Sequence, residues 1–296
     1  MSAFADRLIE AVRQKASPLC VGLDPFAERI PALFGDARAD VGAIERFGQA
    51  IIDAAAPYTR ILKPQLGLFE PFGPEGVAVA RSLTAYAREK GFLVILDAKR
   101  GDIGTTAEGY ARASLGPAPG FEADAVTVNP YMGADTLAPF LDIAAERDKG
   151  VAVLVRTSNP GARDLQDLDC AGAPLWMRTA EMLAPLTTRL KGQSGWSGLM
   201  VVAGATYPEE ARRLRAALPK SLFLVPGYGA QGASAADAVT GFISGPHGLE
   251  GGVVNSSRAI LYPKAAAEAP SLEAWRAEIE SALKRASGEL ADACAA

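Results

Sequence analysis

The densest cluster of charged residues in this 296-residue sequence lies in the stretch FLVILDAKRGDIGTT, which begins at Phe92. Five apolar residues are followed, within six positions, by Asp97, Lys99, Arg100 and Asp102. Buried charges are costly unless they compensate one another, so such a cluster directly after a buried strand predicts a functional site. A lysine held between two carboxylates stays charged in a dry site, where it can donate a proton and stabilise developing negative charge.

Strand geometry predicts how this cluster is arranged. Side chains alternate along a strand, so Asp97 and Lys99 are expected on one side, and Arg100 on the other, toward surrounding helices. The sequence TTAE that follows matches a capping box, with Thr105 as the N-cap and Glu108 as its partner. The next helix is therefore predicted to begin there, close behind the charged residues.

Apolar runs that end in polar residues recur along the chain. The other polar ends are Asp24, Lys63, Asn129, Thr157 with Ser158, and Asn255 with Arg258. In a barrel of parallel strands all of these ends converge on one face, where active sites are built. Lys63 would bring a second cation to the cluster, in an array that alternates in sign in the order Lys63, Asp97, Lys99, Asp102. A purely structural network of ion pairs is the alternative.

Two glycine-containing segments near the C-terminus predict a site for the other end of a ligand. The segment VPGYGAQG (225–232) follows the seventh strand, and NSSRAI (255–260) closes the eighth. Gly227 and Gly229 let backbone N–H groups approach an anion, Gln231 can donate from its amide, and Arg258 offers a planar fork for phosphate oxygens. The glycines alone could simply shape a turn, but together with the arginine they favour a phosphate monoester.

The elements that must position these residues form a repeating pattern. Eight β-rich runs are separated by helical patterns or loops: LCVGLD (19–24), TRILKP (59–64), FLVILDAK (92–99), DAVTVNP (124–130), VAVLVRTS (151–158), GLMVVAG (198–204), SLFLVPG (221–227) and GGVVNSS (251–257). This alternation predicts an α/β fold, a single (β/α)₈ TIM barrel over residues 1–296. An open doubly wound sheet is the rival, but the first strand lacks the glycine-rich fingerprint typical of that fold.

One helix is expected before the first barrel strand in the sequence, and another after the last. Phe4, Leu8, Ile9 and Val12 mark the apolar face of an amphipathic helix before the first strand, in a segment too polar for a signal peptide. A docking helix is predicted over about residues 271–286, with Ser271 as its N-cap and Trp275, Ile279 and Leu283 on one stripe. No linker divides the chain, and residues 159–175 fit a lid after the fifth strand.

Composition excludes several classes of function. The net charge of −4 is opposite in sign to the positive charge expected of a protein that binds nucleic acid. No apolar run reaches the length of a membrane span. The three cysteines, Cys20, Cys170 and Cys294, are far apart and are expected as reduced thiols in a cytoplasmic protein. His247 is the only histidine and is expected in a loop, so no metal site built on several histidines is predicted.

Seven motifs together resemble one family. VGLDPF, LKPQLGLFE, LDAKRGDIGTT, VNPYMGADTLAPF, VRTSNPG, VPGYGAQG and NSSRAI occur in the order found in the orotidine 5′-phosphate decarboxylase family, in its longer bacterial (type 2) form. The Asp-x-Lys-x-x-Asp signature also occurs in sibling phosphosugar enzymes, whereas seven ordered motifs are far more specific. The resemblance implies decarboxylation of orotidine 5′-monophosphate (OMP) to uridine 5′-monophosphate (UMP), without metal or organic cofactor, in the last step of pyrimidine synthesis.

The resemblance also implies a role for each candidate residue. Asp24 and Lys63 would hold the ribose hydroxyls, Asp97 would lie against the substrate carboxylate, and Lys99 would protonate C6 as carbon dioxide leaves. Asp102 and Thr106 would reach the active site of the other subunit in a homodimer. Ser158 would bind the pyrimidine ring, while Gln231 and Arg258 would grip the phosphate.

Two departures from the family pattern are Leu68, where an aromatic residue is expected, and the bulky Tyr228 among the glycines of the phosphate segment. Both departures bear on how the loops pack, and neither changes the polar residues named above. Two rival functions stay open at this point: a sibling barrel decarboxylase or aldolase that uses Mg²⁺, and a barrel that only binds a nucleotide. The first needs a carboxylate at the second strand end, where this chain has Lys63, and Glu70 is expected in the following loop or helix.

Overall fold

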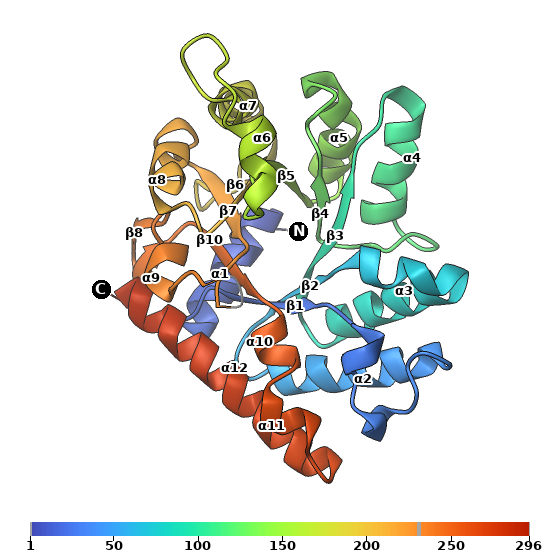
Figure 1. Cartoon of the computed structure of the whole chain (residues 1–296). Coiled ribbons are helices and arrows are strands. Elements are labelled where there is room, and N and C mark those ends of the chain that lie inside the picture. The colour runs from blue at the N-terminus through green and yellow to red at the C-terminus, as the bar shows by residue number, and fades with distance from the viewer. Residues whose placement is uncertain (1, 230–231, 296) are drawn as a thin grey trace.

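Eight parallel strands close into a barrel in the order β1-β10-β7-β6-β5-β4-β3-β2 (Figure 1). The computed structural model describes residues 2–229 and 232–295. The barrel strands are β1 (Leu19–Leu23), β2 (Ile61–Pro64), β3 (Leu93–Arg100), β4 (Ala125–Val128), β5 (Gly150–Arg156), β6 (Ser197–Ala203), β7 (Ser221–Val225) and β10 (Gly252–Ser256). The predicted (β/α)₈ architecture and its eight strands are confirmed.

Helices surround the barrel (Figure 1). The longer ones are α1 (Phe4–Lys15), α2 (Val41–Ala55), α3 (Gly73–Glu89), α4 (Gly104–Leu115), α5 (Ala138–Glu146), α7 (Leu175–Leu183), α8 (Pro208–Ala217) and α12 (Leu272–Ala295). Four single-turn helices are α6 (Arg163–Gln166), α9 (Ala235–Ala238), α10 (Arg258–Leu261) and α11 (Lys264–Ala267). Within the described residues, none of these helices combines the length and apolar character that membrane crossing requires.

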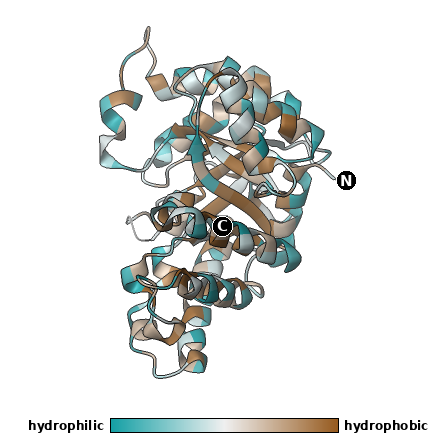
Figure 2. Ribbon diagram, turned by 90° about the vertical axis from the view of Figure 1, so that its right-hand side faces the viewer, coloured by the Kyte–Doolittle hydropathy of each residue, from teal (hydrophilic) through white to brown (hydrophobic). Residues whose placement is uncertain are grey.

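The barrel strands are apolar on both faces, as expected for a parallel sheet covered by helices (Figure 2). Outward-facing residues pack against the helices, and inward-facing residues such as Ile95 and Met200 form a second cluster with α1. The predicted apolar face of α1 is buried in this cluster. Gly150, at the start of β5, has no room for a Cβ, which would lie 2.5 Å from the Phe4 ring. The helix α1 therefore covers the N-terminal ends of these strands, while functional residues gather at the other end.

Three sequence predictions need correction. The helix α4 begins at Gly104 with Ile103 as its N-cap and without a side-chain cap, so the capping box proposed for Thr105 and Glu108 is wrong. A hairpin of β8 (Ile243–Gly245) and β9 (Gly248–Glu250) was missed, and its turn contains His247. The C-terminal helix does not stop near residue 286 but continues to Ala295.

The start and buried stripe of α12 are as predicted. Ser271 Oγ accepts a hydrogen bond from Ala274 N (3.2 Å), and Trp275, Ile279 and Leu283 are buried. The helix contacts α2, α9 and α10, and it runs along one side of the barrel toward the C-terminus (Figure 1). Because α9 and α10 follow β7 and β10, α12 supports the side of the barrel that carries the predicted phosphate segments.

Candidate active site

Asp97 is the centre of the charged cluster. Its side chain is only 8% exposed, and each of its carboxylate oxygens receives two hydrogen bonds. Lys63 Nζ (2.6 Å) and Gln65 Nε2 (3.0 Å) donate to Oδ2. Lys99 Nζ (2.6 Å) and Thr127 Oγ1 (2.9 Å) donate to Oδ1. Donors from the ends of β2, β3 and β4 thus fix this carboxylate from four directions.

Burial and charge oppose each other at this cluster. Burial alone would raise the pKa of Asp97, but the ammonium groups of Lys63 and Lys99 hold that pKa below its ordinary value of 3.8. Burial would likewise lower the pKa of Lys63, but the carboxylates of Asp97 and Asp24 raise it above its ordinary value of 10.5. Asp97 and Lys63 are therefore both ionised at neutral pH, although the Lys63 side chain is only 6% exposed.

The backbone at Lys99 is not that of the regular strand, with alternating side chains, that was predicted from the sequence. Lys99 has a φ of 47°, in the left-handed region, and the pairing of β3 with β4 shifts register between Leu96 and Arg100. The contact between Lys99 and Asp97 is present, but regular alternation is not its cause. The Lys99 side chain is 47% exposed, so its ammonium is held by Asp97 and still open to solvent. Arg100 turns outward to Glu70 (2.7 Å), as predicted.

Two of the four groups that bind Asp97, Gln65 and Thr127, were not predicted from the sequence. Gln65 comes two positions after Lys63, so the period of a strand could have placed it on the same face. Thr127 is the one polar residue inside β4, between Val126 and Val128, and is buried. A lone hydroxyl in a buried strand must find a partner, and that requirement was the available signal.

Asp24, directly after β1, carries a buried carboxylate oxygen. Its Oδ1 is inaccessible to solvent and makes no hydrogen bond within the described part of the chain. Its backbone oxygen accepts a hydrogen bond from the Tyr262 hydroxyl (2.8 Å), which fixes the position of the residue. A buried carboxylate oxygen in this state is suited to accept a hydrogen bond from a ligand hydroxyl.

Asp102 and Thr106 are not joined to the cluster of their own chain. The Asp102 carboxylate accepts a hydrogen bond from Ile103 N (2.8 Å), and no contact with Lys99 is found among the described residues. Thr106 is exposed in the first turn of α4. Both residues lie in the segment that leaves the tip of β3.

At the predicted phosphate end, Gly227 and Gly229 have φ values of 100° and 73°, which side chains rarely adopt. Between them, Tyr228 points into the core and donates a hydrogen bond from its hydroxyl to Glu289 of α12 (2.6 Å). The bulky residue is thus an anchor of this loop. Arg258 is exposed at the start of α10. Gln231 lies outside the described residues.

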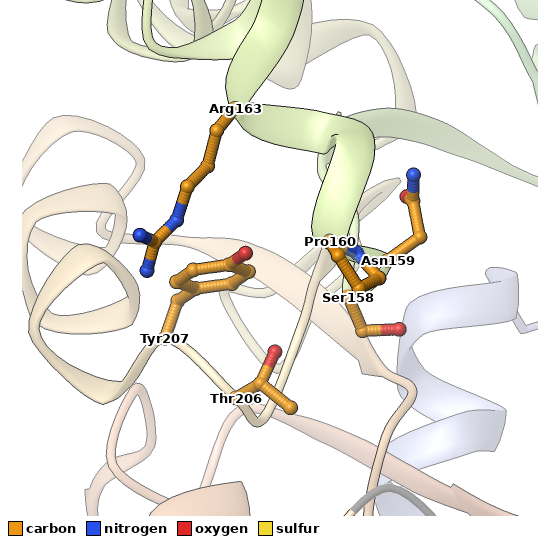
Figure 3. Close-up of a pocket in the computed structure, with 6 residues that line it drawn as sticks. All are labelled: Ser158, Asn159, Pro160, Arg163, Thr206 and Tyr207. Atoms are coloured by element: carbon orange, nitrogen blue, oxygen red, sulfur yellow. The ribbon is translucent and has the colours of Figure 1, made fainter.

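Ser158 follows β5 and lines a cavity of about 660 Å³ together with Asn159, Pro160, Arg163, Thr206 and Tyr207 (Figure 3). The Arg163 guanidinium lies 5.8 Å from the centre of the Tyr207 ring, and that of Arg156 lies 3.8 Å from it. Thr206 Oγ1 is buried and has no hydrogen-bond partner in the described chain. Asn159, Pro160 and Arg163 belong to the segment that was predicted as a lid, whereas Thr206 and Tyr207 were not singled out from the sequence.

The segment over residues 159–175 is attached to the end of β5. Gln166, in α6, accepts a hydrogen bond from Thr157 N (3.0 Å) and donates one to Thr157 Oγ1 (2.8 Å). Asp167 pairs with the buried Arg156 at 3.0 Å. These contacts hold the segment beside Ser158; its motion as a lid stays a prediction.

Leu68, the other departure from the family pattern, is half-buried next to the fully buried Phe69.

Known proteins resemble this chain over most of its length. A model of the orotidine 5′-phosphate decarboxylase / HUMPS family matches residues 17–270. The orotidine 5′-phosphate decarboxylase of Rhodopirellula baltica is 40% identical over 272 residues, which cover 88% of this chain and 89% of the relative. That of Clostridium perfringens is 40% identical over 260 residues, covering 87% and 88%. The structure of Leishmania donovani OMP decarboxylase superposes with a TM-score of 0.79 at 31% identity, covering 99% of both chains. The chain therefore belongs to the orotidine 5′-phosphate decarboxylase / HUMPS family.

Proposed function

We propose that this chain acts as a single (β/α)₈ domain that decarboxylates OMP to UMP in pyrimidine synthesis. The observation that carries the proposal is the array in which Lys63 and Lys99 both bind the buried carboxylate of Asp97, at the end of the barrel where active sites are built. Two relatives are named orotidine 5′-phosphate decarboxylase, and each is 40% identical to this chain over most of its length. Reduced cysteines, all three without a disulfide, support a cytoplasmic location.

In the proposed reaction the bond between C6 and the carboxylate carbon breaks, carbon dioxide leaves, and the electron pair stays at C6. Lys99 donates its proton to that pair, and its neutral amine regains a proton from solvent, to which the side chain is open. Before transfer, the ammonium stabilises the negative charge that develops at C6. Asp97 supports this by holding the ammonium at 2.6 Å, in a position that needs no rearrangement during the reaction.

The remaining candidate residues would bind the two ends of the nucleotide. Asp24, with its unpartnered buried oxygen, and Lys63 would hold the ribose hydroxyls. Ser158 would bind the pyrimidine from the wall of its cavity. Arg258 and Gln231 would grip the phosphate, together with backbone N–H groups near Gly227 and Gly229.

We further propose that two copies of the chain form a homodimer with shared active sites. Asp102 and Thr106 lie beyond the end of β3 and do not contact the Lys99 of their own chain within the described residues. Exposed apolar side chains surround this segment: Ile103, Tyr110, Tyr131 and Met132. The β3 and β4 loops adjoin, because a Cβ on Gly101 would lie 3.8 Å from Met132. A second copy related by two-fold symmetry would cover this surface and bring each Asp102 to the opposite Lys99.

Loss of orotate absorbance with OMP as substrate tests the proposed reaction directly. We expect turnover by the wild-type protein that is unchanged in EDTA, and a loss on the order of 10⁴-fold in kcat for Lys99→Ala. Turnover abolished by EDTA would favour a sibling enzyme that uses Mg²⁺, whose second strand end needs a carboxylate. Here Glu70, the nearest candidate, is bound to Arg100. Binding of UMP without any turnover of OMP would favour a barrel that only binds nucleotides.

A further inference from the structure

We infer that Thr127 is a positioning residue, which sets the place of Lys99 through the backbone of β3. This inference rests on the proposed function for its kinetic readout, but its geometry is independent of it. Thr127 lies inside β4, is 1% exposed, and contacts β3 at the point where the register between the two strands shifts.

The hydroxyl of Thr127 makes three hydrogen bonds to β3. It donates to Asp97 Oδ1 (2.9 Å) and accepts from the backbone N–H groups of Ala98 (3.0 Å) and Lys99 (2.9 Å). A hydroxyl has one proton to donate and two lone pairs to accept with, so all of its capacity is used. A single atom therefore ties the side chain of Asp97 to the backbone that carries Lys99.

These bonds are needed because the strand is irregular there. Lys99 has a φ of 47°, so its N–H and that of Ala98 do not continue the regular ladder between β3 and β4. A lysine in this conformation is strained and persists only when its surroundings fix it. The Thr127 hydroxyl supplies that constraint, and it also fixes the oxygen of Asp97 to which Lys99 Nζ binds.

The consequence concerns kcat more than substrate binding. Thr127 has no group left to offer a ligand, while the Lys99 ammonium must be positioned accurately, to within a fraction of an ångström, relative to C6 to donate its proton. A misplacement of about 1 Å can reduce a rate by roughly 100-fold. Binding of the ribose and phosphate depends on other strand ends and should change little.

Thr127→Val keeps the shape of the side chain and removes the hydroxyl, whereas Thr127→Ser keeps the hydroxyl. We expect kcat to fall about 100-fold in Thr127→Val, while the Kd for UMP, measured by calorimetry, stays within about threefold of wild type. Thr127→Ser should recover kcat to within about fivefold of wild type. Thr84→Val is the matched control: Thr84 is equally buried, but among the described residues its hydroxyl bonds only to Ala80 O within α3. It should leave both kcat and the Kd for UMP unchanged.

A second comparison separates the two roles of the hydroxyl. Gln65 also donates to Asp97, but to Oδ2, and no bond from it to the backbone of Ala98 or Lys99 is found in the described part of the chain. Gln65→Leu should therefore reduce kcat clearly less than Thr127→Val. Equal losses would mean that the bond to Asp97 alone matters and would overturn the inference.

A kcat for folded Thr127→Val within threefold of wild type would also overturn it. If Thr127→Val does not fold, Thr127→Ser and Thr127→Ala decide the matter, because equal kcat values for these two would show that the hydroxyl is not needed. If wild-type protein does not act on OMP, the proposed function fails separately. The geometric part is then tested by a crystal structure of Thr127→Val, which should show a changed φ at Lys99; an unchanged φ would contradict it.

Discussion

Asp97 and Lys63 form a pair in which each buried charge depends on the other. The distance between Lys63 Nζ and Asp97 Oδ2 is 2.6 Å, and both side chains are at most 8% exposed. Removal of one partner leaves an uncompensated buried charge, which costs far more than the pair itself contributes. Substitutions at this pair should therefore affect stability as well as activity.

Asp97→Asn should reduce the free energy of unfolding by about 3 kcal/mol at pH 7, because Lys63 loses its counter-charge. The difference from wild type should shrink in acid. The pKa of Asp97 is lowered in the folded protein, so its contribution is complete above the ordinary value of 3.8 and is lost as the pH falls through the folded pKa. Urea denaturation of both proteins between pH 7 and pH 3 measures this. A difference that does not shrink below pH 4 would contradict the assignment.

Arg258 is the residue that the phosphate proposal depends on most. Arg258→Ala should raise KM for OMP strongly and lower kcat/KM, because phosphate binding also stabilises the transition state. For orotidine, which has no phosphate, kcat/KM should barely change. Steady-state kinetics with both substrates provide the comparison, and equal losses on the two would show that Arg258 does not bind the phosphate.

Among the secondary-structure elements, α12 has a direct connection to the loop after β7. The Tyr228 hydroxyl donates to Glu289 of α12, and burial together with this hydrogen bond raises the pKa of Tyr228 above its ordinary value. Gly227 and Gly229 flank the tyrosine with left-handed backbone. The anchor therefore sets where the backbone N–H groups of the loop point.

Tyr228→Phe removes the hydroxyl that binds α12 and should raise KM for OMP by roughly fivefold, since such a hydrogen bond contributes about 1 kcal/mol. KM for orotidine should not change. Tyr86→Phe is a matched control, because its hydroxyl donates to Asp53 (2.9 Å) between α2 and α3, away from the strand ends. The same rise in KM for both variants, or for both substrates, would mean that the anchor does not act on phosphate binding.

The barrel strands were predictable because they are buried, mainly apolar runs that end in polar residues, as in β3. The hairpin β8–β9 was not, because its strands have three residues each and are partly exposed. The TTAE sequence failed as a capping box because the left-handed Gly104 already begins α4, two residues before the predicted start at Thr106. The contact of Lys99 with Asp97 was foreseen, but its left-handed backbone depends on a hydroxyl from another strand. Local sequence does not contain that information.

For the whole molecule, the proposed dimer makes a prediction that a monomer does not. Lys99→Ala and Asp102→Ala chains should each be nearly inactive alone. In a hybrid dimer one site would collect both substitutions and the other would have native Lys99 and native Asp102. Random exchange makes about half of the dimers hybrid, so roughly a quarter of all sites should be restored. Activity after subunit exchange, with dimers verified by analytical ultracentrifugation, measures this fraction.

The control mixes wild-type chains with chains that carry both Lys99→Ala and Asp102→Ala. If sites are shared, each site of that hybrid contains one substitution, so activity should fall by about half on exchange. If Asp102 acts within its own chain, activity should stay constant in the control, and the first mixture should remain inactive. The two mixtures thus give opposite results under the two arrangements.

Cys20 of β1 lies inside the barrel, fully buried, with its Sγ 3.9 Å from Asn255 Oδ1. Burial raises its pKa to about 12, so it keeps its proton at any pH at which the enzyme would work. Lys63, Asp97 and Asp24 all act on it electrostatically. The S–H stretching vibration absorbs in a part of the infrared spectrum where other kinds of protein group are silent, and its frequency depends on the local electric field. Cys170 and Cys294 carry the other thiols of the chain, so a variant that lacks both leaves Cys20 as a spectroscopic probe beneath the charged cluster, able to report field changes there without any label.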